Sequence, residues 1–302
     1  MCGIVGLYLK TDRHEQQLGH LAALMLHEMR ARGPDSAGFS IYDANAVRSD
    51  VTRITVLAES VEVDWEHVRS GLAAALATTV DVRPIHDHAV LETDGDGRAA
   101  RQWLIDHQPQ LDVLAYGKAI ELFKAVGDPD GVADRFDLAK RAGTHVVAHT
   151  RMATESAITT NGSHPFSTGA DTCLVHNGSL SNHNQLRERL EACGETFQTE
   201  NDSEVAAGYL AWRLREGDSL EQALHGALDD LDGFYTLAIG VQDGFAVLRD
   251  AIACKPAVIA ETDDWVAMSS EFRAIAQLPE VNDADVWEPE PATVYTWTRG
   301  AA

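Results

Sequence analysis

Basic side chains are scarce in this 302-residue sequence. Lys and Arg total 24 against 47 Asp and Glu, which gives a formal net charge of -23. Such a charge repels nucleic-acid phosphates and anionic lipid, so neither is expected as a partner. The sequence also has no apolar run near the ~18 residues of a membrane span, and no basic segment followed by an apolar one at its start. We therefore expect a cytoplasmic protein.

Cysteine is sparse as well. The four cysteines, Cys2, Cys173, Cys193 and Cys254, form no CxxC pair and are too few for a disulfide scaffold at this length. Their spacing does not suit an iron–sulfur cluster, and no GxGxxG opens a βα unit. We expect reduced thiols and no cofactor in this chain. Only Cys2 is distinguished by its position, directly after the initiator methionine.

The order of apolar and polar residues predicts strands at both ends of the chain with helices between them. Helical spacing of Leu and Met predicts a helix over residues 15–30, after a strand over 2–9. Further helices are expected at about 181–193, 203–215 and 219–231, with Gly194 as a stop. The segments "GFYTLAIGVQDGFAVLRD" and "AVIAETDDWVAMSS" each read as two strands, the first with a turn at Asp243 and Gly244. This order favours two packed sheets covered by helices.

The pattern of expected strands and helices changes over residues 51–141. Short Val-rich strands alternate there with expected helices at about 65–77, 99–107 and 118–126. The segment therefore looks like an α/β subdomain inserted into a larger domain.

The opening "MCGIVGLYLK" places a thiol where it would become the first residue after removal of Met1. The α-amino group of Cys2 would then have a pKa of ~7.7 to 8.0 and serve as the general base for its own thiol. Gly3 leaves space for a substrate. The alternative is an incidental cysteine with Met1 retained.

A thiolate that attacks an amide needs donors for the oxyanion. In "VHNGSL", the side-chain amide of Asn177 and the backbone N–H of Gly178 can point at one spot. The alternative is an ordinary Asn-Gly turn.

Two charged residues suit an amino-acid substrate. Arg151 in "HTRMAT" can bind a carboxylate bidentately, although a surface ion pair is the alternative. Asp202 in "TENDSEV" can bind an α-ammonium, and as an alternative or in addition it can be the N-cap of the helix that follows.

Pairs of histidines were tested as metal ligands. His145 and His149 in "HVVAH" lie in a Val-rich strand pattern, where they are roughly 13 Å apart and cannot share an ion. His86 and His88 in "HDH" share a strand face, but ordinary surface histidines are the favoured interpretation. No metal site is expected.

Taken in order, Cys2-Gly3-Ile4, "RGPDSAG", "HTRMAT", "HPF", "HNG" and "NDSE" resemble the class II glutamine amidotransferases, which are N-terminal-nucleophile hydrolases. The resemblance covers roughly residues 2–45 and 145–275. It implies an α+β fold, a four-layer αββα sandwich, with residues 1–302 forming one amidotransferase domain and 51–141 inserted within it. It also implies hydrolysis of L-glutamine to glutamate and ammonia through a thioester.

The same resemblance assigns roles to individual residues. Cys2 would be nucleophile and base, Asn177 and Gly178 the oxyanion hole, Arg151 the partner of the α-carboxylate and Asp202 that of the α-ammonium. Two further residues, Arg32 and Thr154, match positions that line the same pocket.

Within the family, the sequence looks most similar to free-standing amidotransferase subunits of glutamate-synthase-like enzymes, including N-methylglutamate synthase. This implies synthase subunits as partners, with FMN and iron–sulfur clusters on those separate chains. Two alternatives stay open: a stand-alone N-terminal-nucleophile amidase, and a catalytically silent regulatory subunit of the same fold.

Overall fold

A computed structural model describes residues 2–43, 50–59, 62–152 and 158–299. Its largest sheet has seven antiparallel strands in the order β14-β12-β13-β1-β8-β2-β7. Their bounds are β1 Gly3–Leu9, β2 Ser36–Tyr42, β7 Ile120–Val126, β8 His145–Arg151, β12 Val258–Glu261, β13 Trp265–Ser269 and β14 Asp285–Trp287. A second antiparallel sheet has the order β15-β11-β10-β9, from β9 Cys173–Leu180, β10 Gly233–Val241, β11 Gly244–Arg249 and β15 Thr293–Thr298.

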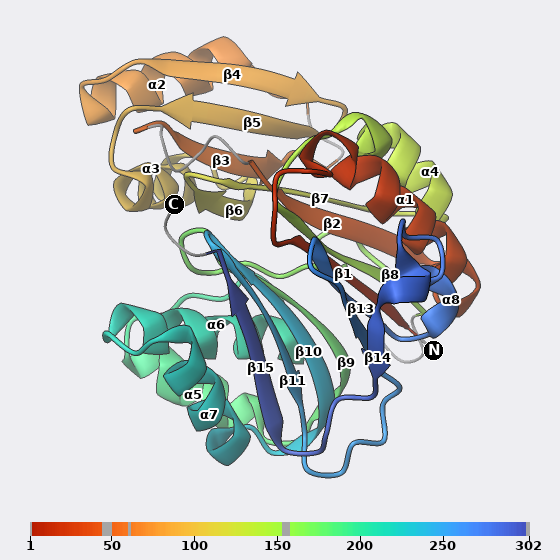
Figure 1. Ribbon diagram of the computed structural model, residues 1–302. Helices are drawn as coiled ribbons and strands as arrows, with labels where there is room; N and C mark the ends of the chain where they lie inside the picture. The colour runs from red at the N-terminus through yellow and green to blue at the C-terminus, as the bar shows by residue number, and fades with distance from the viewer. Residues whose placement is uncertain (1, 44–49, 60–61, 153–157, 300–302) are drawn as a thin grey trace.

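The two sheets face each other, and helices cover their outer faces (Figure 1). The seven-stranded sheet carries α1 Leu18–Met29, α4 Pro129–Arg135 and α8 Phe272–Ile275, and the four-stranded sheet carries α5 His183–Ala192, α6 Asp202–Arg215 and α7 Leu220–Asp230. Separate apolar clusters fill the three interfaces between these layers. The expected four-layer αββα sandwich is confirmed.

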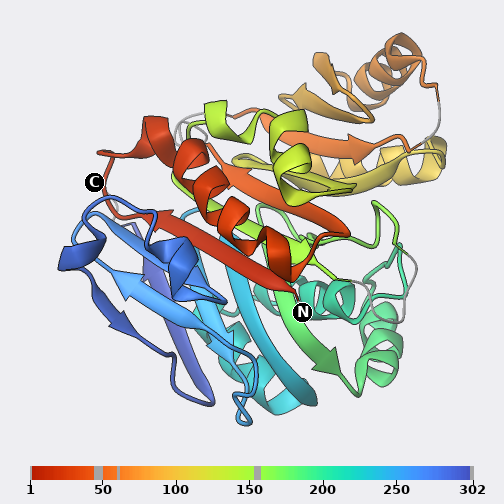
Figure 2. The ribbon, with the colours of Figure 1, turned by 90° about the vertical axis from the view of Figure 1, so that its right-hand side faces the viewer.

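Strand β8 shows how the layers are specified. Val146 and Ala148 point into the cluster under α1, whereas Val147 points into the cluster between the sheets. Because side chains alternate along a strand, His149 and Arg151 share the inter-sheet face with Val147. The apolar packing ends at these two polar residues, which lie beside the start of β1. Figure 2 shows β1 beginning, at the N label, at one end of the sheet.

The helix expected over residues 118–126 is wrong. Ile120–Val126 is strand β7, which pairs with β2 at the edge of the seven-stranded sheet. Leu122 packs between the sheets and Phe123 packs under the helices, so both faces of β7 are buried. A strand buried on both faces loses its alternation and cannot be told from a buried helix by periodicity. The other expected helices are confirmed within a few residues at their ends.

A separate four-stranded sheet is formed by residues 52–117. It contains β3 Thr52–Leu57, α2 Trp65–Leu76, β4 Val80–Ile85, β5 His88–Thr93, α3 Gly97–His107 and β6 Asp112–Gly117. The strands are antiparallel in the order β4-β5-β3-β6, and the unit has its own apolar cluster. This order and connectivity are those of a ferredoxin-like β-α-β-β-α-β unit. The rest of the segment expected to be inserted, through β7 and α4, packs within the main sandwich.

The turn between β10 and β11 lies at Gln242 and Asp243, one residue before the expected position. Among the described residues, no helix is long and apolar enough to cross a bilayer.

Candidate active site

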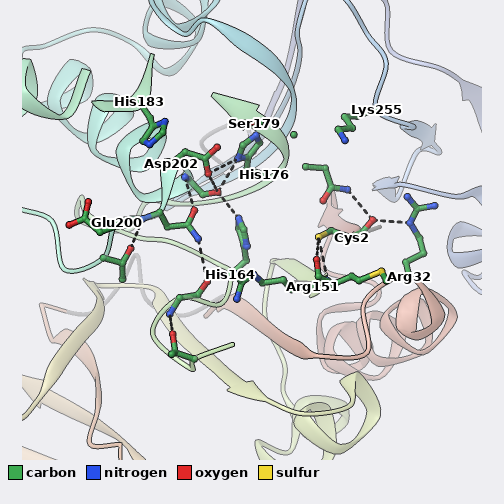
Figure 3. A pocket seen from close by; sticks show the side chains of 18 of the residues that line it. Cys2, Arg32, Arg151, His164, His176, Ser179, His183, Glu200, Asp202 and Lys255 are labelled. Carbon is green, nitrogen blue, oxygen red and sulfur yellow. Dashed lines mark hydrogen bonds and ion pairs between the residues drawn. The ribbon is translucent and has the colours of Figure 1, made fainter. Parts of the chain in front are cut away.

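A cavity of about 790 Å³ opens where β1 begins and where β8 and β9 approach the first turn of α6 (Figure 3). Cys2, Arg32, Arg151, Asn177, Gly178 and Asp202 all line it. The structure thus brings together six of the seven residues expected at the site. The seventh, Thr154, lies outside the described residues.

Cys2 is fixed at the mouth of this cavity by contacts to its backbone and its sulfur. The Nε of Arg32 donates a hydrogen bond to the Cys2 carbonyl oxygen at 2.8 Å, and the same guanidinium forms an ion pair with Glu271 at 2.6 Å. The backbone N–H of Met152 lies 3.5 Å from Cys2 Sγ and donates to it. Arg32 therefore supports the nucleophile, in addition to lining the pocket.

The thiol of Cys2 is activated by its surroundings. Burial alone would raise its pKa, but the nearby ring of His149 and the N–H of Met152 outweigh burial and lower the pKa to about 7. A large fraction of the group is therefore thiolate near neutral pH, which is the nucleophilic form.

Asn177 is buried on β9 and faces the seven-stranded sheet. Its Nδ2 donates to the Cys2 carbonyl oxygen at 3.3 Å and to Ser270 Oγ at 3.2 Å. His149 Nε2 lies 3.0 Å from Asn177 Oδ1, and because an amide oxygen only accepts, His149 is the donor. The amide is held with its N–H groups toward the residue that carries the thiol.

Gly178 cannot be replaced without moving the backbone. Its φ is +152°, and a Cβ built on it would lie 2.0 Å from the carbonyl oxygen of Phe234. The Asn-Gly turn considered for this dipeptide is wrong, because both residues lie within strand β9 and pair with β10.

Asp202 begins α6, and the alternative that it is the N-cap is wrong. The cap is Asn201, whose side chain accepts from the N–H of Ser203 at 2.9 Å. Asp202 instead accepts from the N–H of Leu180 at 2.9 Å. Burial would raise its pKa, but the hydrogen bond and charge of His176 and the N–H of Leu180 lower it to about 2. The carboxylate is ionised and suited to a cation.

Arg151 ends β8 and is 7 % exposed at the wall of the cavity. Arg151 is therefore not a surface side chain. A buried guanidinium beside a cavity is suited to a carboxylate ligand.

Three buried histidines connect the nucleophile to Asp202, and the sequence analysis did not assign them to the site. The rings of His149 and His164 are in contact, with centroids 4.1 Å apart and planes tilted by 30°. His164 Nε2 and His176 Nδ1 each lie 2.9 Å from the hydroxyl of Ser203, next to Asp202 in α6. Burial is the main cause that lowers the pKa of His164 well below its usual range, and neighbouring cationic groups add to it. This ring is therefore neutral.

The interpretation of His86 and His88 as surface histidines is wrong for His88, which is fully buried and packs on the ring of Phe136. His145 and His149 make separate contacts. The ring of His145 stacks on Tyr42 with centroids 3.9 Å apart, while His149 contacts Asn177. In the described part of the chain, no group of three or more His, Cys, Asp or Glu side chains is placed to hold a metal ion.

Comparison with known proteins agrees with this geometry. A family model described as a glutamine amidotransferase domain matches residues 149–277. Glutamine amidotransferase-like protein GlxB of Rhizobium meliloti (strain 1021) is 50% identical over 300 residues, which cover 98% of each chain. The chain belongs to the class II glutamine amidotransferases, a family of enzymes with the N-terminal-nucleophile fold.

More distant relatives are similar at lower identity or over only part of one chain. A putative glutamine amidotransferase of Methanothermobacter thermautotrophicus is 31% identical and covers 98% of this chain and 99% of its own. A glutamine–fructose-6-phosphate aminotransferase of Rhizobium leguminosarum bv. viciae is 35% identical over 160 residues, 53% of this chain and 26% of that enzyme. The solved glutamine phosphoribosylpyrophosphate amidotransferase of B. subtilis has a TM-score of 0.62 at 20% identity, covering 98% of this chain and 47% of that one. This last likeness shows the fold.

Proposed function

We propose that this chain is the glutaminase subunit of a glutamate-synthase-like enzyme. In this proposal it hydrolyses L-glutamine to glutamate and ammonia and delivers the ammonia to a partner synthase chain. The observation that carries the proposal is the joint placement of Cys2, Asn177, Arg151 and Asp202 around one cavity.

The polar groups of the cavity suit free glutamine. The guanidinium of Arg151 would bind the α-carboxylate, and the ionised carboxylate of Asp202 would bind the α-ammonium. Two opposite charges at the α-carbon end leave the side-chain amide to reach the thiol. A stand-alone amidase that acts on peptides or acyl amides has no use for this pair.

The reaction follows from the groups around the thiol. After removal of Met1, the free α-amine of Cys2 takes the thiol proton, and Sγ attacks the side-chain amide carbon of glutamine. The oxyanion receives hydrogen bonds from Asn177 Nδ2 and the N–H of Gly178. The C–N bond then breaks, and the α-ammonium returns the proton to the leaving nitrogen, which departs as ammonia. Water attacks the thioester in the second half and releases glutamate and the thiol.

The proposed partner rests on the extent of the similarity. The chain matches GlxB along almost its whole length, whereas it covers only 26% of the fructose-6-phosphate aminotransferase, a protein with much further sequence. We infer that the ammonia acceptor lies on separate chains, which in an N-methylglutamate-synthase-like complex would carry FMN and iron–sulfur clusters.

One experiment separates this function from the alternatives. The intact mass of the purified chain is measured before and after reaction with 6-diazo-5-oxo-norleucine, and ammonia release from glutamine is assayed in parallel. We expect loss of Met1, one adduct on Cys2, and no adduct or ammonia with Cys2→Ala. Retained Met1 without labelling identifies a silent subunit, and faster hydrolysis of acyl amides than of glutamine identifies a stand-alone amidase.

The partner is tested with synthase chains added. We expect glutamine-dependent amination of the acceptor to require intact Cys2, while amination with added ammonium salt does not. If Cys2→Ala supports glutamine-dependent amination as well as the unmodified chain, this subunit is not the nitrogen donor.

A further inference from the structure

A second cavity, of about 350 Å³, lies between the ferredoxin-like unit and the helical layer of the sandwich. Helix α3 and strand β6 form one wall, while residues 168–172, the loop before α6 and the last turns of α6 form the other. In Figure 1 this is the junction where α3 and β6 lie over α6. The cavity is separate from the candidate active site, with which it shares no lining residue.

Arginine is concentrated in this cavity although the chain as a whole is strongly acidic. Arg98 and Arg101 lie three residues apart on α3, so both face the cavity from the same side of the helix. Neither forms an ion pair with a described residue, and the guanidinium of Arg101 lies 5.8 Å from the centroid of the Tyr116 ring. Two guanidinium groups thus face the cavity without a counter-charge.

The opposite wall adds one arginine, whose charge is neutralised by a glutamate. Arg215, near the end of α6, forms an ion pair with Glu195 and also donates to the carbonyl oxygen of Cys193 at 3.0 Å. Arg98, Arg101 and Arg215 against Glu195 leave two positive charges uncompensated in the lining. In a chain with a net charge of -23, this is the reverse of the average surface.

The cavity also offers hydroxyl donors. Three threonines, Thr168, Thr172 and Thr196, are among the lining residues. Guanidinium groups have only donors and threonine hydroxyls can also donate, so the lining as a whole is rich in hydrogen-bond donors. A suitable ligand is therefore rich in acceptor oxygens.

We propose that this cavity binds a small phosphate-bearing molecule. A phosphate monoester carries about -1.5 to -2 charge at pH 7 and three acceptor oxygens, which matches the uncompensated charge. A monocarboxylate would leave one arginine unpaired, and a nucleic-acid backbone is repelled by the net charge of the chain. The planar fork of arginine binds phosphate oxygens bidentately.

Occupancy would connect two parts of the fold. The ligand would bridge α3 of the ferredoxin-like unit to Arg215 of the sandwich. We therefore expect binding to slow hydrogen exchange in α3 and in the 194–196 loop, independently of any glutaminase activity.

The test uses the full chain and inorganic phosphate as the probe. Binding is measured by calorimetry and by the phosphate-dependent rise in melting temperature, with sodium chloride at equal ionic strength as reference. The variant is Arg98→Gln with Arg101→Gln. The matched control is Arg69→Gln, which removes a guanidinium from α2 of the same unit, where Arg69 pairs with Glu66 outside the cavity.

We expect the unmodified chain and Arg69→Gln to bind phosphate equally and the double variant to bind at least about tenfold more weakly. Equal stabilisation of all three proteins by phosphate would be a general salt effect and would overturn the proposal. Tighter binding of succinate than of phosphate would overturn the assignment of the ligand class. If the double variant does not fold, Arg101→Lys keeps the charge but loses the fork, and its affinity must fall severalfold.

Discussion

His149 holds the side-chain amide of Asn177 in one orientation. Its Nε2 donates to Asn177 Oδ1 at 3.0 Å, while Asn177 Nδ2 donates to the Cys2 carbonyl oxygen at 3.3 Å. His149 also lowers the pKa of the Cys2 thiol. One buried ring therefore acts on both the nucleophile and the proposed oxyanion donor.

Replacing His149 should impair both functions together. In His149→Phe, Asn177 Oδ1 loses its donor, so the amide can rotate, and we expect kcat for glutamine hydrolysis to fall about 10²-fold or more. His149→Gln keeps an N–H donor and should retain more activity. Steady-state kinetics of the three proteins measure this difference, and equal losses in both variants would contradict the positioning role.

The reactivity of Cys2 should follow a pKa of about 7. Alkylation is measured in a background with Cys193→Ser and Cys254→Ser, because these two thiols are exposed, while burial raises the pKa of Cys173. The rate should increase with pH to half its maximum near pH 7, since only the thiolate reacts. In His149→Phe the midpoint should move up toward the ordinary value of 9.0. A midpoint that is the same in both proteins would mean that His149 does not activate the thiol.

Much of the site could be predicted because its residues lie at strand and helix ends that carry local signals. The place of His149 at the site could also have been predicted, since alternation along β8 puts it on the same face as Arg151. The places of His164 and His176 at the site cannot be predicted from such an alternation pattern. They meet at Ser203 from a loop, a strand and a helix, 39 and 27 residues away along the chain, and no local pattern links these segments.

Lys124 explains why the sequence pattern of β7 resembles that of a helix. It interrupts an apolar run, which suggests a solvent-exposed face, yet it is 2 % exposed. Its ammonium donates to the carbonyl oxygens of Asn161 at 2.8 Å and of Ser163 at 2.9 Å, in the segment leading to His164. From sequence alone, a buried lysine whose ammonium donates to carbonyl oxygens of a distant loop cannot be distinguished from a surface lysine.

Asp202 should contribute to stability in acid. Its pKa in the folded chain is about 2, against an ordinary value of 3.8. A depressed carboxyl pKa stabilises the fold above the ordinary value, and this contribution is lost as pH falls from about 4 to 2. We expect about 2 kcal/mol, so the free energy of unfolding of Asp202→Asn should depend less on pH in this range. Urea unfolding at several pH values measures it.

The control for this prediction is Asp229→Asn, which removes an exposed carboxylate. Its unfolding free energy should keep the pH dependence of the unmodified chain. If Asp202→Asn also keeps that dependence, then His176 and Leu180 do not hold the carboxylate as the geometry indicates.

Gly178→Ala should abolish glutamine hydrolysis by displacing the backbone N–H of residue 178. The added Cβ would lie 2.0 Å from the carbonyl oxygen of Phe234, so β9 must move away from β10 and carry the N–H of residue 178 with it. We expect a loss of stability of about 2 kcal/mol or more, together with loss of glutamine hydrolysis. Thermal unfolding and the ammonia assay measure the two effects.

Gly194→Ala is the matched control, because Gly194 also has a positive φ, +89°, but a Cβ there meets nothing within 4 Å. It should lose stability through backbone strain alone, by about 1 kcal/mol, and keep its catalytic rate below its melting temperature. The comparison separates the strain of a left-handed residue from the steric displacement of β9. If Gly178→Ala keeps the rate of the control, the backbone at residue 178 does not stabilise the oxyanion.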